Sequence, residues 1–116
     1  MGDRGNIEIA QPFADESVFL YTHWRGSEVT QILAEALQTE RTNDPSYLTR
    51  IIFQEMLGDD RSSRSFGISV GRPDDNEYDI PKVFWSEGHL TEGMVEYKDV
   101  NYSFDDFIQR FKKEVG

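Results

Sequence analysis

The sequence contains no cysteine and only two histidines, His23 and His89. The lack of cysteine excludes disulfide bonds, a thiolate nucleophile and the common cysteine-ligated zinc sites. The two histidines lie far apart in the sequence and lack the helical spacing of a zinc hydrolase. A bound metal would need His and carboxylate ligands, and we expect neither a metal nor a cofactor.

Long apolar runs are also missing. No stretch approaches the roughly 20 apolar residues that a membrane-spanning helix needs. The first residues, Met1 to Asn6, lack the apolar core of a signal peptide. We therefore expect a cytoplasmic protein that does not contact a membrane.

Basic residues are few, with 12 Lys and Arg against 22 Asp and Glu, which gives a formal net charge of -10. A surface of this sign repels phosphate backbones and anionic lipid headgroups. Direct binding of nucleic acid is therefore not expected. A protein partner with a basic surface is favoured instead, because opposite charges accelerate association.

Familiar catalytic motifs are absent from the sequence as well. It has no phosphate-binding P-loop, no glycine pattern of a dinucleotide-binding strand and no serine flanked by the glycines of a hydrolase. These absences leave enzyme activity open but favour a protein without catalysis.

The residues that are present suffice for one folded unit. Hydrophobic residues make up 37% and aromatic residues 13% of the chain, which supports a single domain over residues 1–116. Alternating or helical apolar spacing predicts strand, strand, helix, helix, strand, strand, strand and helix in that order. The segments are 6–9, 17–24, 27–37, 45–57, 66–70, 82–85, 94–97 and 104–111. The expected class is α+β, one compact domain with an antiparallel or mixed sheet and the helices packed on one face.

Capping residues predict where the helices begin and end. Ser27 and Ser103 can accept hydrogen bonds from the free amides of a first helical turn. Asp44 followed by Pro45 predicts a second helix start, because proline at the first helical position loses no hydrogen bond. Gly58 predicts the end of that helix.

Five segments resemble a family of small uncharacterised proteins encoded in bacteria and their phages. The family carries the motifs GDRGN-I, VYLYTHW-G, YL-RIIF-EM, GIS and DNE in this order. The matching segments here are Gly2–Ile7, Val18–Gly26, Tyr47–Met56, Phe66–Ser69 and Asp75–Tyr78. The resemblance covers most of the chain up to Tyr78 and is less clear between Trp85 and Tyr97. It implies a bacterial or phage setting and assigns no catalytic residue.

Four residues form a candidate polar cluster: His23, Arg25, Glu55 and Glu77. His23 and Arg25 close a strand, where side chains can line a cleft. Glu55 falls within an apolar helical arc, so it must be paired, protonated or at the edge of the arc. Pairing of Glu55 with His23 or Arg25 would resemble an oriented general base, although a structural ion pair explains the same pattern.

An acidic run provides a candidate interaction surface at Asp74, Asp75, Glu77 and Asp79. Clustered carboxylates can hold a divalent cation, but the run lacks the spacing and the glycine of an EF-hand loop. A solvated acidic turn is the simpler interpretation. The loop from Arg61 to Ser65 carries two arginines that could contact a phosphate or an acidic partner, and a solvated loop explains it as well.

Three functions remain open at this point. The first is an acidic interaction module, in the form of a phage or bacterial inhibitor or adaptor that binds a basic, nucleic-acid-handling protein such as a host-defence protein. The second is a small-ligand-binding protein or enzyme with a His23, Arg25 and Glu55 pocket. The third is a self-associating structural subunit that pairs through a sheet edge or an aromatic patch.

Overall fold

A computed structural model describes residues 2–60, 65–86 and 89–112 of the chain. The elements in chain order are β1 (Gly5–Ala10), β2 (Val18–Thr22), a 3-10 turn (Gly26–Glu28), α1 (Val29–Ala36), α2 (Pro45–Leu57), β3 (Phe66–Val70), β4 (Lys82–Ser86), β5 (His89–Tyr97), β6 (Val100–Ser103) and α3 (Phe104–Phe111). The predicted loop residues Arg61 to Arg64 and the turn at 87–88 lie outside the described residues.

The six strands form one sheet in the order β3-β2-β1-β4-β5-β6. All neighbouring strands are antiparallel except β1 and β4, which run parallel. The sheet is therefore mixed, which is one of the two arrangements, antiparallel or mixed, that the sequence predicted. Strand β2, with a neighbour on each side, lies inside the sheet.

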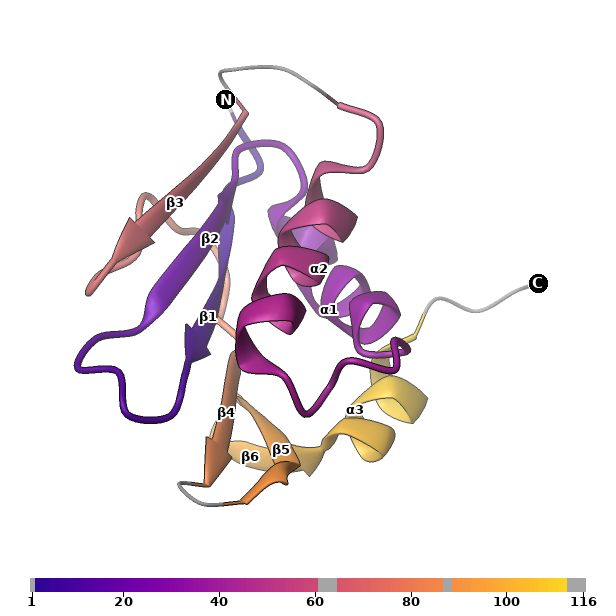
Figure 1. Ribbon diagram of the computed structural model, residues 1–116. Coiled ribbons are helices and arrows are strands. Elements are labelled where there is room, and N and C mark those ends of the chain that lie inside the picture. The colour runs from indigo at the N-terminus through magenta and orange to yellow at the C-terminus, as the bar shows by residue number, and fades with distance from the viewer. Residues whose placement is uncertain (1, 61–64, 87–88, 113–116) are drawn as a thin grey trace.

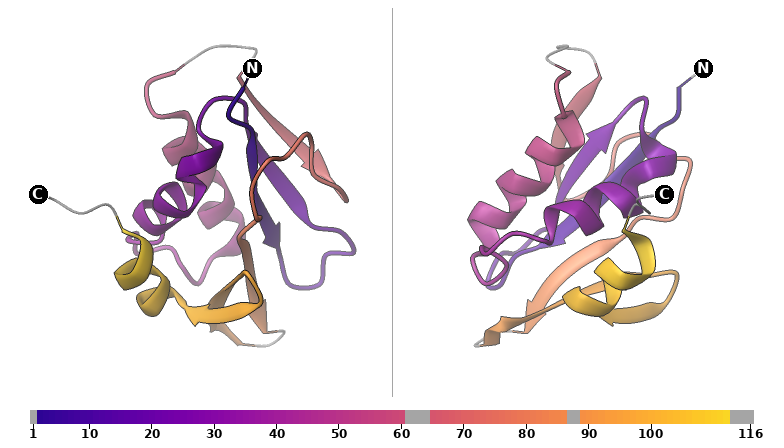
Figure 2. Two further views of the ribbon diagram at one scale, coloured as in Figure 1. Left: turned by 180° about the vertical axis from the view of Figure 1, so that it is seen from behind. Right: turned by 90° about the vertical axis from the view of Figure 1, so that its right-hand side faces the viewer.

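The three helices lie together on one side of the sheet (Figures 1 and 2). Their apolar stripes meet the alternate strand residues that point the same way, and this contact forms the core. Its completely buried members are Ile7, Ile9, Leu20, Leu33, Ala34, Leu48, Ile52, Met56, Val83, Val95 and Phe107. The predicted α+β class, with helices on one face, is confirmed.

Most predicted helix boundaries match the structure. The Asp44 side chain accepts a hydrogen bond from the Tyr47 amide at 3.4 Å, Pro45 is the first residue of α2, and Gly58 ends that helix with a positive φ of 56°. Ser103 caps α3 by accepting from the Asp106 amide at 3.1 Å. The prediction for Ser27 was wrong, because α1 begins two residues later and the Ser27 hydroxyl donates to Asp3 instead.

One strand, β6, had no counterpart in the sequence-based prediction. It pairs with β5 through a two-residue turn at Lys98 and Asp99, both of which have positive φ. Positive φ at both central residues is typical of a type I′ hairpin, which usually has Asn-Gly or Asp-Gly at this position. The hairpin was not predicted because Lys98-Asp99 does not match this sequence pattern.

The opposite side of the sheet, here called the open face, carries Arg4, Asn6, Phe19, Tyr21 and the other residues that alternate with the core positions. Residues 71–81, here called the crossover, connect β3 at the edge of the sheet to β4 beside β1. The view from behind shows the crossover passing over the open face (Figure 2). The helices and the crossover thus lie on opposite sides of the sheet.

None of the helices in the described part of the chain combines the length and the apolar character needed to cross a bilayer.

Candidate functional site

The crossover is fixed to the open face by Asn6. Its side chain is only 1% exposed, and its Nδ2 donates to Asp74 O at 3.3 Å, Asp75 O at 3.3 Å and Asn76 Oδ1 at 3.2 Å. All three partners are acceptors, so the amide nitrogen must point toward the crossover. Removing one partner of a buried hydrogen bond costs free energy, because the other partner is left unsatisfied. Asn6 therefore holds the acidic run in place.

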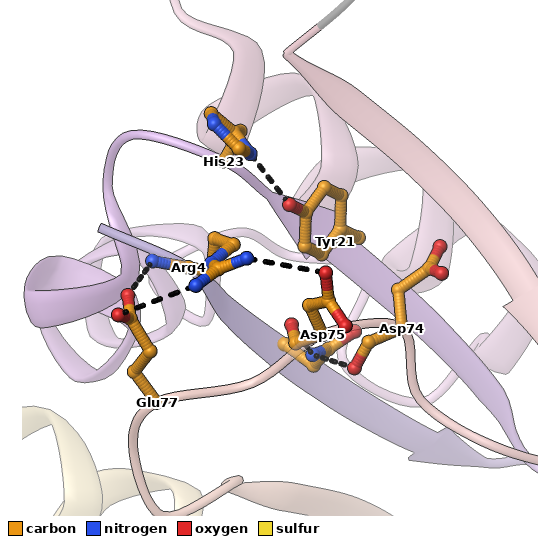
Figure 3. Close-up of polar contacts among 7 residues, drawn as sticks. Arg4, Tyr21, His23, Asp74, Asp75 and Glu77 are labelled. Carbon is orange, nitrogen blue, oxygen red and sulfur yellow. Dashed lines mark hydrogen bonds and ion pairs between the residues drawn. The ribbon is translucent and has the colours of Figure 1, made fainter. Parts of the chain in front are cut away.

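Arg4 forms the second attachment, and it uses both its backbone and its side chain (Figure 3). Its amide donates to Glu77 Oε2 at 2.7 Å, and its carbonyl oxygen accepts from the Glu77 amide at 2.9 Å. Its guanidinium lies 3.2 Å from Asp75 Oδ2 and 3.7 Å from Glu77 Oε1. The Asp75 side chain is 76% exposed, so its ion pair contributes at most about 1 kcal/mol. The backbone bonds of Arg4 therefore position Glu77.

Asp3 connects the crossover to the turn before α1. The Tyr78 hydroxyl donates to Asp3 Oδ1, while the Ser27 hydroxyl donates to Asp3 Oδ2 at 2.7 Å and the Ser27 amide at 3.3 Å. Hydrogen bonds from Tyr78 and then Ser27 lower the pKa of the Asp3 carboxyl group from its usual 3.8. The bond to Asp3 also raises the pKa of Tyr78. Asp3 thus accepts hydrogen bonds at this turn, where the sequence analysis expected the Ser27 hydroxyl to be the acceptor.

Glycines allow the N-terminal segment to pass directly against this turn. A Cβ atom added to Gly26 would lie 2.6 Å from the carbonyl carbon of Arg4, and one added to Gly5 would lie 2.7 Å from Gly26 Cα. Both contacts are with backbone, which cannot move aside as a side chain can. Gly5 and Gly26 therefore have a packing role.

His23 lies at the end of β2 beside Tyr21. The Tyr21 hydroxyl and His23 Nδ1 are 2.7 Å apart, and the Trp24 ring meets the imidazole edge-on with centroids 4.4 Å apart. Burial raises the pKa of the Tyr21 hydroxyl. A neutral tyrosine next to a histidine forms a structural hydrogen bond at neutral pH, and Trp24 stays 55% exposed next to it.

Arg25 and Glu55 are close, but not through their charged groups. Arg25 Nη1 donates to the backbone oxygens of Met56 at 3.0 Å and Glu55 at 3.4 Å, which lie at the carboxyl end of α2. A cation at this end of a helix satisfies free carbonyl groups and complements the helix dipole. Arg25 Nε also faces Glu28 Oε2 at 3.5 Å. Glu55 itself is exposed, so it occupies the edge of the apolar arc.

The four residues of the candidate polar cluster therefore have separate partners. His23 contacts Tyr21, Arg25 contacts the end of α2, and Glu77 contacts Arg4. The suggested pairing of the Glu55 carboxylate with His23 or Arg25 is not formed. The structure thus does not unite the four side chains in one catalytic arrangement.

The acidic surface, by contrast, is present as an exposed feature. Asp74 and Asp75 are exposed on the crossover, and Asp79 is 63% exposed with Lys98 Nζ 4.0 Å from its carboxylate. Glu77 is the most strongly held of the four acids. No group of three or more metal-ligating side chains occurs among residues 2–60, 65–86 and 89–112. The arginines at 61 and 64 lie outside these ranges.

Sequence reasoning missed the residues that build the attachment: Asp3, Arg4, Asn6 and Tyr78. Asn6 gave no clear signal, because Asn6 and Glu8 alternate with Ile7 and Ile9 as the polar residues of a half-exposed strand do. Two buried atoms, Arg4 Nε and Asn6 Oδ1, have no hydrogen-bond partner within the described part of the chain. One is a donor and the other an acceptor, on neighbouring residues of the same face.

Comparison of the chain with protein-family models, curated proteins and solved structures gives no significant match. The bacterial and phage setting implied by the sequence motifs therefore remains an expectation.

Proposed function

We propose that this protein is a non-catalytic interaction module that presents the crossover as an acidic docking surface. Its partner is a protein with a basic, nucleic-acid-handling surface, and the protein acts as an inhibitor or adaptor in a bacterial or phage setting. The observation that carries this proposal is the contrast within the crossover between held backbone and exposed charge. Asn6 and Arg4 fix its main chain, while the Asp75 side chain stays 76% exposed.

Such an arrangement is suited to binding because the charges are positioned before the partner arrives. Ordering a loop during association costs free energy, and a loop that is already held avoids much of that cost. A cluster of one sign also accelerates encounter with an oppositely charged surface. The crossover carries Asp74, Asp75, Glu77 and Asp79 against a single Arg72.

The two other functions are less well supported. The proposed pocket of His23, Arg25 and Glu55 would need side chains that converge, and these have separate partners. Self-association through a sheet edge is opposed by the net charge of -10 on each copy.

The proposal is tested with two triple variants that remove the same charge. Asp74→Asn, Asp75→Asn and Asp79→Asn neutralise the crossover but leave Glu77 and the backbone attachments in place. Glu35→Gln, Glu40→Gln and Glu55→Gln neutralise three exposed acids on the helical side. Each protein is immobilised, and proteins retained from a bacterial lysate at 50 mM salt are quantified by mass spectrometry.

We expect the wild type and the helix-side variant to retain the same basic nucleic-acid-handling protein, and the crossover variant to lose it. Calorimetry with that purified partner should show the affinity of the crossover variant reduced by about tenfold or more, with weaker binding at 300 mM salt. Equal retention by both variants, or retention that ignores salt, would contradict the proposal.

A further inference from the structure

Strand β3 is an edge strand with unusual surface properties. It ends the sheet beyond β2, and Figure 1 shows it on the side away from the three helices. Its sequence, Phe-Gly-Ile-Ser-Val, contains no charge and no proline. Ile68 and Val70 are 59% and 60% exposed. Natural edge strands are usually protected by charge, proline or a cover, so this edge is suited to pairing with another strand.

The hydrogen bonds between β2 and β3 show which backbone groups of β3 face outward. The His23 amide donates to Ser65 O at 2.8 Å, and the Gly71 amide donates to Ser17 O at 2.9 Å. In an antiparallel ladder, directly opposed residues alternate between bonded and non-bonded pairs. The bonded pairs along the register are therefore Tyr21 with Gly67 and Phe19 with Ser69.

The intervening residues Phe66, Ile68 and Val70 consequently turn their amide and carbonyl groups away from β2. Their side chains lie on the same side of the sheet as Leu20, which is a core residue opposite Ile68. Gly67 and Ser69 face the opposite way, onto the open face. The outer edge thus combines backbone groups that bond to no other described residue, an apolar row on one face and small residues on the other.

The crossover places a negative charge beside this edge. A Cβ atom added to Gly67 would lie 4.0 Å from Asp74 Oδ2, so the Asp74 carboxylate lies over the glycine on the open face. Figure 3 shows Asp74 beside Tyr21, the residue opposite Gly67. A strand added to β3 would therefore find apolar side chains on one of its faces and an acid on the other.

We propose that the outer edge of β3 binds an extended segment of the partner in which apolar and basic residues alternate. This inference rests on the proposed function and names the binding mode. The residue opposite Ile68 exchanges two backbone hydrogen bonds with it and lays an apolar side chain beside Ile68 and Val70. Its neighbours project lysine or arginine side chains across Gly67 toward Asp74 and Asp75.

Charge distinguishes this occupant from a second copy of the chain. Two β3 edges could pair through their apolar rows, but pairing would bring two acidic crossovers onto the same face. Like charges across an interface disfavour association, whereas a basic segment removes the repulsion. The surface therefore favours a basic strand.

The probe is a blocked eight-residue peptide of alternating valine and lysine with a fluorescent label. The control peptide has the same composition in the order of four lysines followed by four valines. Binding is measured by fluorescence anisotropy at 50 mM salt. We expect the wild-type protein to bind the alternating peptide about tenfold more tightly than the control peptide, because only alternation places the two side-chain types on opposite faces.

Ile68→Pro tests the backbone bonds. Since the Ile68 amide points outward, proline at this position removes no bond to β2, and edge strands tolerate proline with this orientation. We expect about tenfold weaker binding of the alternating peptide, with Ile68→Val as the conservative control near wild type. Asp74→Asn should weaken binding about fivefold, and Glu35→Gln should leave it unchanged.

Hydrogen exchange of the wild-type protein provides a readout that does not depend on folding of a variant. Added alternating peptide should slow exchange at the amides of Ile68 and Val70, whereas Gly67 and Ser69 are already bonded to β2. Binding that is equal for both peptides, or unchanged exchange at Ile68 with bound peptide, would overturn the proposal. Slowed exchange at Ile68 that depends on protein concentration alone, with dimers in sedimentation, would assign the edge to a second copy.

These results separate the two proposals. If the peptide fails but the crossover variant still loses its captured partner, the docking surface stands and strand addition is wrong. If the crossover variant retains its partner, the proposed function fails whatever the peptide does.

Discussion

The two faces of the sheet are held by different kinds of contact. On the helical face, Leu20, Leu48 and Ile52 are completely buried among other apolar side chains. On the open face, Asn6 is almost as buried, but it is surrounded by backbone and side-chain acceptors of the crossover. Apolar packing is non-directional, whereas hydrogen bonds fix both distance and orientation.

This difference shows how the two faces divide stability and positioning. Apolar burial supplies most of the folding free energy, so the helical face stabilises the chain. The hydrogen bonds of the open face add less free energy each, but they set the path of a charged segment that has few apolar residues of its own. The following predictions test this division.

The largest effect is expected from Leu48→Ala on the helical face. Leu48 is fully buried in α2, and truncation leaves a cavity in addition to the lost apolar contact. The free energy of unfolding should fall by about 2–5 kcal/mol, measured by urea denaturation. A loss below about 1 kcal/mol would show that the helical face contributes less than this comparison requires.

A smaller loss is expected from Asn6→Ala on the open face. Removal of the amide leaves the carbonyl groups of Asp74 and Asp75 without their donor and should cost about 1–3 kcal/mol. Hydrogen exchange should speed up at the Glu77 amide, which is bonded to Arg4, and remain nearly unchanged in α2. Exchange that speeds up equally in both places would show that the two faces unfold as one unit.

The open face should also respond to pH. The hydrogen bonds to Asp3 lower its pKa, so its stabilising contribution is complete above the unfolded value of 3.8 and is lost as the pH falls through the lower folded value. Tyr78 has a raised pKa, so its contribution is complete below 10.0 and is lost as the pH rises through the higher folded value. The double variant Asp3→Asn with Tyr78→Phe lacks both groups. Its free energy of unfolding should therefore fall less than that of the wild type at both low and high pH. Identical pH profiles for the two proteins would show that the hydrogen bond between Asp3 and Tyr78 does not contribute to stability.

The smallest effect is expected from Glu55→Gln. Glu55 is exposed, and Arg25 contacts its backbone oxygen rather than its carboxylate. Unfolding free energy should change by no more than about 0.5 kcal/mol, measured by urea denaturation. A larger loss of unfolding free energy would show that the Glu55 carboxylate is paired after all.

The sequence predicted the helical face well, because that face depends on local periodicity. The apolar spacing around Leu33, Ile52 and Phe107 identified all three helices, and Asp44 and Ser103 located two of their starts. The acidic run was also identified as exposed. These features depend on residues within a few positions of one another.

The attachment of the crossover could not be predicted in the same way. Asn6 and Asp74 are 68 residues apart, and their contact exists only because β4 returns to pair with β1. Ser27 satisfies the usual pattern of a helix cap, yet Asp3 from a distant segment takes its hydroxyl. The β6 hairpin was missed because Lys98 and Asp99 adopt a backbone conformation that their types seldom show.

The parallel pairing of β1 with β4 has a consequence for the order in which this protein can form on the ribosome. The register joins only Glu8, Ile9 and Ala10 to Lys82, Val83 and Phe84. The first two strands can pair with each other early, but one edge of β1 stays unpaired until Lys82 to Phe84 have been synthesised. During that interval an unpaired strand edge is exposed to other nascent chains, and a chaperone that covers it would raise the yield of folded protein.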